Sequence, residues 1–109
     1  MLEKQVENQI KKWLEQHNYW YFKVHGGPFQ KVGVPDIIAC INGRFVAIEV
    51  KRPSGGVISK LQQIQMERIK VNGGVVGVAR SLDEFLKILK DSESLWCYTN
   101  IKKICWIKV

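Results

Sequence analysis

The sequence has no apolar run near the roughly 20 residues that are needed to span a membrane. Its first residues, MLEKQVENQIKKW, are charged from the third position and lack the continuous apolar stretch of a secretory signal. At 109 residues, the chain is long enough for one modest hydrophobic core. We therefore expect a single domain over residues 1–109 that is cytoplasmic and has no membrane partner.

Cysteine and acidic residues are both scarce. The three cysteines, Cys40, Cys97 and Cys105, are an odd number without metal-ligand spacing, which favours free thiols over a zinc site. Only 10 Asp and Glu residues oppose 17 Lys and Arg residues, so the formal net charge is +7. A basic balance in a small domain is compatible with binding a polyanion, although many basic proteins bind none.

The order of the secondary-structure elements follows from hydrophobic periodicity and turn residues. The predicted elements are a helix over 2–17, strands over 19–25, 36–41 and 44–51, a helix over 59–72, a strand over 75–79, a helix over 81–90 and one or two strands in the tail, 94–109. In the second helix, we expect Leu61, Ile64 and Ile69 to face the core. This order predicts an α/β fold in which helices flank one central mixed sheet, with a right-handed crossover between its parallel strands.

The dipeptide Asn42-Gly43 separates two apolar runs, which is a strong signal for a hairpin with a two-residue turn. Such a turn pairs Ile41 with Arg44. Counting back along both strands then places Asp36 opposite Glu49. The hairpin rule therefore predicts two carboxylates side by side at one end of the sheet.

Glu49 and Lys51 are two residues apart on the second strand, so their side chains project from the same face. The carboxylates of Asp36 and Glu49 repel each other unless Lys51 or a metal cation relieves the repulsion. This is a geometric reason to expect a Mg²⁺ site. The alternative is a solvated charge pair at the end of a strand.

The same residues resemble a known family. The segments GVPD (33–36) and AIEVKRP (47–53) resemble the VRR-NUC branch of the PD-(D/E)XK nuclease superfamily. Three further features match that branch: Gly55-Gly56, then Ser59-Lys60-Leu61-Gln62 opening a helix, and Gly73-Gly74 before the next strand. The resemblance extends over residues 3–90.

The resemblance implies a restriction-endonuclease-like α-β-β-β-α-β-α core and a Mg²⁺-dependent deoxyribonuclease, with Mn²⁺ as a substitute. Asp36 is then the central metal ligand, Glu49 and the Val50 carbonyl are further ligands, and Lys51 orients or deprotonates the attacking water. The family's acidic residue on the first helix matches Glu7, with Glu3 in reserve. The alternative for both glutamates is an ordinary surface position near a helix N-terminus.

Gln62 has two interpretations. Ser59 and Gln62 form a capping-box pattern that needs no functional explanation, whereas the resemblance implies that Gln62 also points at the active site. The basic residues Lys31, Arg52 and Lys60 flank the motifs and are expected to contact the DNA backbone.

Stand-alone members of the branch imply a homodimer that cuts branched DNA such as a Holliday junction, and a phage source. Exposed aromatic residues are candidates for the dimer interface: Trp20, Tyr21, Trp96 and Trp106. Two other interpretations stay open. One is a monomeric nuclease acting on flaps, nicks or duplex, and the other is a non-catalytic nucleic-acid-binding module on the same scaffold.

Overall fold

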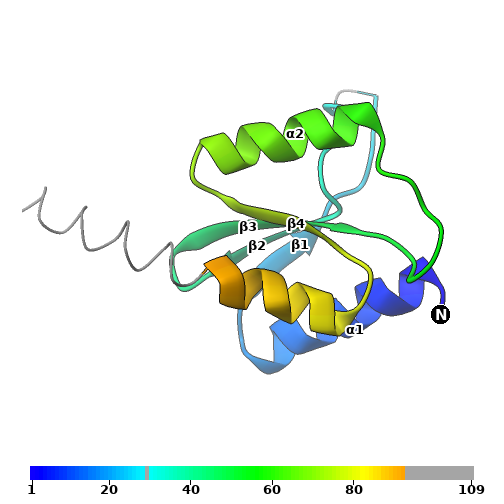
Figure 1. Ribbon diagram of the computed structural model, residues 1–109. Helices are drawn as coiled ribbons and strands as arrows, with labels where there is room; N and C mark the ends of the chain where they lie inside the picture. The colour runs from blue at the N-terminus through cyan, green and yellow to red at the C-terminus, as the bar shows by residue number, and fades with distance from the viewer. Residues whose placement is uncertain (29, 93–109) are drawn as a thin grey trace, which may run out of the picture.

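The computed structural model describes residues 1–28 and 30–92 (Figure 1). The elements are α1 (Glu3–Gln16), β1 (Trp20–Lys23), β2 (Ile37–Ile41), β3 (Arg44–Val50), α2 (Lys60–Val71), β4 (Val75–Ala79) and a last helix from residue 82 to residue 92. The predicted order of elements and the predicted α/β class are therefore confirmed. The strands expected in the tail, Trp96 and Trp106 lie outside the described residues. Within the described ranges, no helix is both long and apolar enough to cross a membrane.

The four strands form one mixed sheet in the order β1-β2-β3-β4. The β1–β2 and β2–β3 pairs are antiparallel, and the β3–β4 pair, which α2 connects, is parallel. Asn42 and Gly43 have φ values of 51° and 80°, which are the left-handed conformations of a type I′ turn. Ile41 pairs with Arg44 and Ile37 pairs with Ile48, so the predicted register is confirmed.

One face of the sheet, which we call the packed face, carries the hydrophobic core. Figure 1 shows α1 and the last helix on this side and α2 on the other. The core consists of Val6, Ile10, Leu14, Ile37, Ala39, Ile41, Val46, Ile48, Val50, Ala79, Phe85 and Leu89. Full burial of one large aliphatic side chain contributes about 1.5–3 kcal/mol, so this layer provides most of the hydrophobic stabilisation.

The opposite face, which we call the open face, carries the alternate side chains of the strands. They are Trp20, Phe22, Ile38, Cys40, Phe45, Ala47 and Glu49. Trp20, Phe22 and Phe45 remain 61%, 46% and 50% exposed, because α2 packs mainly over β4 and leaves most of this face uncovered.

The orientation predicted for α2 is wrong at two of three positions. Leu61 and Ile64 are exposed, and only Ile69 is partly buried. The residues of α2 that are partly buried are Gln62, Gln65, Met66 and Ile69. Their spacing is helical, but the stripe begins with two glutamines, so a search for apolar residues misses it. The first half of α2 therefore presents polar groups to the sheet.

The loop before β2 packs directly against the start of α2. At Gly33, whose φ is +86°, an added Cβ would lie 2.7 Å from the backbone carbon and oxygen of Leu61. Gly43 has a similar φ of +80°, but a Cβ there would meet nothing within 4 Å. The two glycines therefore separate the effect of backbone conformation from that of close packing.

We predict that Gly33→Ala destabilises the protein more than Gly43→Ala. Both substitutions incur the left-handed penalty of about 1–2 kcal/mol. Gly33→Ala adds an overpacking cost of about 1–3 kcal/mol, because backbone atoms cannot move aside easily. Urea unfolding of both variants measures the difference, and equal losses in the free energy of unfolding would contradict the contact with α2.

Candidate active site

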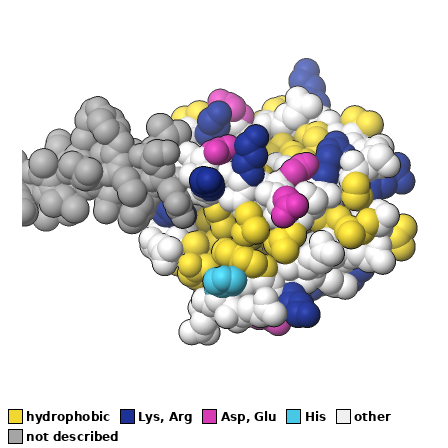
Figure 2. Space-filling model, turned by 60° about the horizontal axis from the view of Figure 1, so that its bottom comes forward, with side chains coloured by type: hydrophobic (Ala, Val, Ile, Leu, Met, Phe, Trp, Pro, Cys, Tyr) yellow, Lys and Arg dark blue, Asp and Glu magenta, His cyan; other side chains and the backbone are white. Residues whose placement is uncertain are grey.

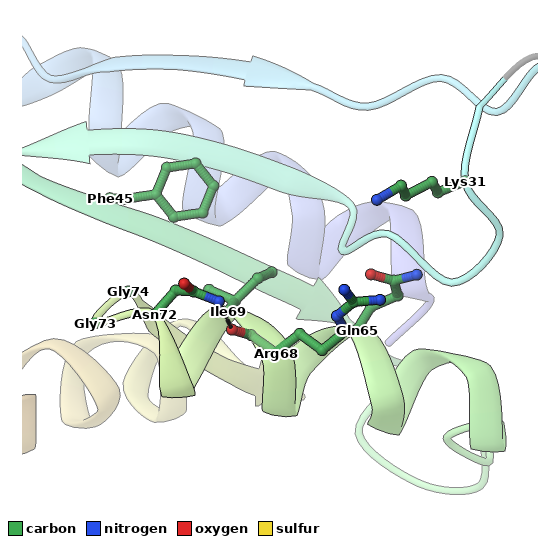
Figure 3. Close-up of a pocket in the computed structure, with 8 residues that line it drawn as sticks. All are labelled: Lys31, Phe45, Gln65, Arg68, Ile69, Asn72, Gly73 and Gly74. Atoms are coloured by element: carbon green, nitrogen blue, oxygen red, sulfur yellow. Dashed lines mark hydrogen bonds between the residues drawn. The ribbon is translucent and has the colours of Figure 1, made fainter.

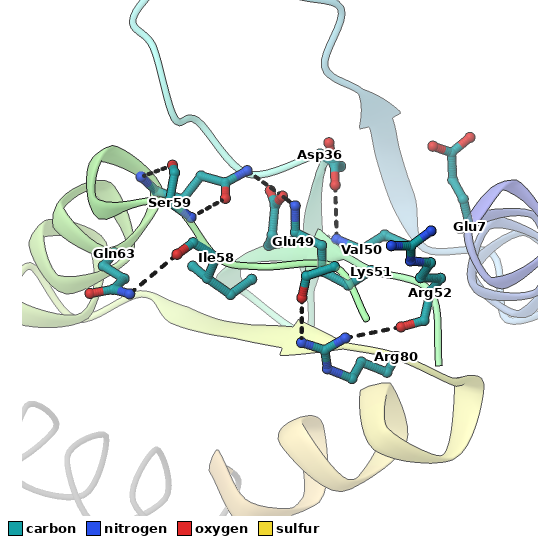
Figure 4. A network of polar contacts seen from close by, with 12 residues as sticks. Glu7, Asp36, Glu49, Val50, Lys51, Arg52, Ile58, Ser59, Gln63 and Arg80 are labelled. Atoms are coloured by element: carbon teal, nitrogen blue, oxygen red, sulfur yellow. Dashed lines mark hydrogen bonds and ion pairs between the residues drawn. The ribbon is translucent and has the colours of Figure 1, made fainter. Parts of the chain in front are cut away.

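Asp36 and Glu49 occupy adjoining positions at the end of the β2–β3 hairpin. Asp36 precedes Ile37 and Glu49 follows Ile48, and Ile37 and Ile48 form the last pair of the antiparallel ladder. The Asp36 Oδ2 atom accepts a hydrogen bond of 2.8 Å from the Val50 backbone N–H, which closes the end of the hairpin (Figure 4). The carboxylate juxtaposition expected from the turn is present.

Glu49 is 3% exposed. Its Oε2 atom accepts a 2.6 Å hydrogen bond from Gln62 Nε2 and lies 3.5 Å from Lys51 Nζ. Its Oε1 atom is buried without a hydrogen-bond partner. Burial and repulsion from Asp36 raise the pKa of Glu49 to about 7, and Lys51 offsets this rise only in part. A buried carboxylate oxygen without a partner is costly, so this atom is suited to a ligand from outside the chain.

The Gln62 side chain both caps α2 and contacts Glu49. Ser59 Oγ accepts a 3.1 Å hydrogen bond from the Gln62 N–H, and the Ser59 N–H donates to Gln62 Oε1 at 2.9 Å. The amide oxygen therefore caps α2, while the amide nitrogen binds Glu49. One side chain thus links the start of α2 to the candidate site.

Glu7 is buried, but its contacts are with lysines. Its carboxylate oxygens lie 2.7 Å from Lys23 Nζ, 2.9 Å from Lys4 Nζ and 3.5 Å from Lys11 Nζ. Burial alone would raise the pKa of Glu7, but hydrogen bonds to Lys23 and Lys4 and their positive charges outweigh it and lower the pKa to about 2. Glu7 is therefore ionised throughout the neutral range.

Lys23 connects Glu7 to the site, because its Nζ atom also lies 3.5 Å from Asp36 Oδ1. Burial favours neutral Lys23, but the two carboxylates dominate and raise its pKa. Sequence reasoning missed this residue. Lys23 pairs with Ile37 next to Asp36, a register that the long connection from residue 24 to residue 36 conceals.

Arg80 is a second residue that sequence reasoning missed. Its guanidinium donates to the carbonyl oxygens of Arg52, Gly55 and Gly56 at 3.0, 2.6 and 3.0 Å. Figure 4 shows Arg80 between β4 and the segment that leaves β3. These bonds hold the chain that follows Lys51.

The three basic residues expected at the DNA backbone are all exposed. Arg52 follows Lys51, Lys60 begins α2, and Lys31 lies on the loop before β2. Figure 2, which views the packed side, shows Lys and Arg side chains over several parts of the surface with acidic side chains between them. The positive charge on that side is therefore spread out rather than gathered in one stripe.

The donors at the site fit Mg²⁺, which prefers oxygen ligands and is commonly held by one or two carboxylates plus water. Asp36 and Glu49 supply two adjacent carboxylates, and Glu49 Oε1 lacks any partner within the chain. Among the described residues, no three His, Cys, Asp or Glu side chains lie close enough to form a metal cluster. Glu7 is connected to Asp36 through Lys23, and its role as a metal ligand stays a prediction.

No protein-family model and no curated protein sequence matches this chain. Among solved structures, one described as "VRR_NUC domain protein" superposes with a TM-score of 0.69 at 20% sequence identity. The match covers 83% of this chain and 86% of that one. At this identity, the likeness establishes a shared fold, and it agrees with the restriction-endonuclease-like core expected from the sequence.

We predict that Glu49→Gln changes how stability depends on pH. The raised pKa of Glu49 means that its contribution is fully favourable below about pH 4.5 and is lost as the pH rises through about 7. The amide that replaces the carboxyl group in this variant does not titrate. In EDTA, the stability of Glu49→Gln relative to wild type should therefore rise by about 3 kcal/mol between about pH 4 and about pH 8.

Urea unfolding across this pH range measures the effect. Glu67→Gln, on the exposed side of α2, is the matched control and should show a nearly constant difference from wild type. A constant difference for Glu49→Gln as well would show that the carboxylate is not buried against Asp36.

Proposed function

We propose that this protein is a metal-dependent DNA endonuclease that hydrolyses phosphodiester bonds, as the resemblance to VRR-NUC nucleases implies. The observation that carries the proposal is the buried Glu49 carboxylate, which adjoins Asp36 and has one oxygen without a partner. A purely structural role would leave this arrangement unfavourable, because like charges at low exposure repel. The shared fold and the net charge of +7 support the same conclusion.

Asp36, Glu49 and the Val50 carbonyl would hold Mg²⁺, with Mn²⁺ as a substitute. When bound, the metal supplies charge neutralisation at the scissile phosphate and lowers the pKa of a water molecule. Lys51 projects beside Glu49, where its ammonium can orient the attacking water and donate to a phosphate oxygen. Gln62 fixes the Glu49 carboxylate, and the Glu7–Lys23 pair positions Asp36.

We predict that Asp36→Asn and Lys51→Ala each lower Mg²⁺-dependent cleavage by more than about 100-fold. Loss of groups that only support metal ligands already costs about 10- to 100-fold, and these residues act closer to the chemistry. The assay uses labelled four-way junction, flap, nicked duplex, duplex and single-stranded DNA with Mg²⁺ or EDTA. Glu67→Gln is the control and should retain wild-type activity.

The same panel separates the alternatives. Preferred cutting of the four-way junction supports a structure-specific junction enzyme, and preferred cutting of flaps or nicks supports the simpler nuclease. If wild-type protein binds DNA but cuts none of the substrates with Mg²⁺ or Mn²⁺, the non-catalytic binding module replaces the nuclease.

A homodimer is the second part of the proposal. Trp20 and Phe22 pack edge to face, with ring centroids 5.5 Å apart, on the edge strand β1 and are about half exposed. Tyr21 is less suited to an interface, because it packs against the core and its hydroxyl donates to Glu15. A two-fold dimer would present two active sites to the two strands of a branched substrate.

We predict that wild-type protein sediments with the mass of two chains and that Trp20→Glu sediments as one. A buried charge at an apolar interface is unfavourable, so the dimer should dissociate. Val71→Glu, an exposed position at the end of α2, is the control and should stay dimeric. A wild-type monomer would favour the monomeric nuclease instead.

A further inference from the structure

A cavity of about 410 Å³ lies on the open face, beyond the candidate active site. It is bounded by α2, β3 and the loop before β2 (Figure 3). Its aromatic wall is Phe45, which is 50% exposed. Phe45 and Glu49 project from the same face of β3 four residues apart, so their Cα atoms are separated by about 13 Å. The cavity is therefore a neighbour of the site rather than part of it.

The polar groups of the cavity gather at the end away from Phe45. Figure 3 shows Lys31, Gln65 and Arg68 together at this end and Phe45 near Gly73 and Gly74 at the other. Gln65 lies one helical turn after Gln62, which binds Glu49, so the polar end is the one nearer the carboxylates. A strand of nucleic acid leaving the site would reach the cations first and the aromatic ring second.

The two cations are free to bind an anion. Neither Lys31 nor Arg68 forms an ion pair within residues 1–28 and 30–92. The side-chain amide of Gln65 likewise has no hydrogen-bond partner in the described part of the chain, whereas Asn72 donates to the Arg68 carbonyl at 2.8 Å. Phosphate binds such cations, and a free amide can bond to the edge of a base.

Glycine at position 74 keeps the aromatic end open. A Cβ there would lie 3.2 Å from Phe45 Cδ1 and 2.6 Å from Ile69 Cγ2, so any side chain would press on the ring. An exposed aromatic ring and free cations within one cavity are the combination with which proteins bind single-stranded nucleic acid. A paired base is unsuited to this cavity, because its faces are stacked within the duplex.

We propose that this cavity binds one unpaired nucleotide of the DNA substrate. The base stacks on Phe45, Gln65 contacts its edge, and Lys31 and Arg68 bind the adjoining phosphates. The inference rests on the proposed function for its class of ligand and deepens it. The preferred substrate then carries an unpaired base close to the cleaved bond, as a flap, a gap or an open junction does.

The test is DNA binding by the full chain in EDTA, which keeps it independent of cleavage. The probe is a flap oligonucleotide in which one unpaired base is 2-aminopurine, whose fluorescence falls when it stacks on an aromatic ring. The wild type should quench the probe. Phe45→Leu should bind it at least about 5-fold more weakly and quench it less, because stacking of one base on an aromatic side chain is lost.

Val71→Ala is the control, because Val71 is an exposed apolar residue outside both the cavity and the proposed dimer interface, and it should behave as wild type. Arg68→Gln should weaken binding and reduce its dependence on salt. Urea midpoints verify that each variant is folded. Fully paired 2-aminopurine duplex should bind Phe45→Leu and wild type equally.

Unchanged binding and quenching by Phe45→Leu would overturn the proposal, as would an equal loss on flap and duplex. Dissociation of a wild-type dimer by Phe45→Leu would also overturn it and assign the cavity to contact between two copies. A protein that quenches the probe but cleaves no substrate retains this inference and refutes the nuclease. A protein that cleaves DNA normally but does not quench the probe supports the nuclease and overturns this inference.

Discussion

Two carboxylates, those of Asp36 and Glu49, lie together at the end of a hairpin where Glu49 is almost completely removed from water. Their repulsion is the constraint around which the neighbouring contacts are arranged. Asp36 is held by the Val50 N–H and by Lys23, and Glu49 is held by Gln62 and Lys51. These contacts fix the positions of both groups, yet burial and, after it, repulsion from Asp36 still raise the pKa of Glu49 to about 7. A site that is positioned in advance but electrostatically unsatisfied is what a bound cation needs, because binding then costs little rearrangement.

The two faces of the sheet have different roles in the fold. The packed face buries a continuous aliphatic layer beneath α1 and the last helix, whereas no residue of α2 is fully buried on the open face. If α2 were packed by an apolar stripe, Gln62 could not reach Glu49 and no cavity would remain beside Phe45. The weak packing of α2 is therefore tied to its polar contacts. Proteins commonly give up stability in this way where a surface must bind something.

The hairpin and its carboxylates were predictable because their geometry is local. Asn42-Gly43 determines a two-residue turn, and the turn then fixes every pair back to Asp36 and Glu49. Lys23 and Arg80 were not predictable. A long connection separates Lys23 from Asp36 and Arg80 from the carbonyls after Lys51 that it binds, and no short pattern encodes the register across it. The side of α2 that faces the sheet was predicted wrongly for a different reason. Apolar periodicity indicates which side of a helix can be buried, but here the side that begins with Gln62 faces the sheet, where Gln62 binds Glu49.

Glu7 shows that a strongly anionic carboxylate is not always the one most available to bind a cation. Three lysines surround it, and two of them, Lys23 and Lys4, lower its pKa to about 2, so it is the more strongly anionic of the two buried glutamates. A cation approaching Glu7 would have to displace an ammonium group, whereas one approaching Glu49 Oε1 would displace no partner within the chain. The less acidic carboxylate is therefore the more available ligand. Glu7 acts on the site through Lys23, whose charge also draws Asp36 into place, and this makes α1 a support for the hairpin as well as a cover for the core.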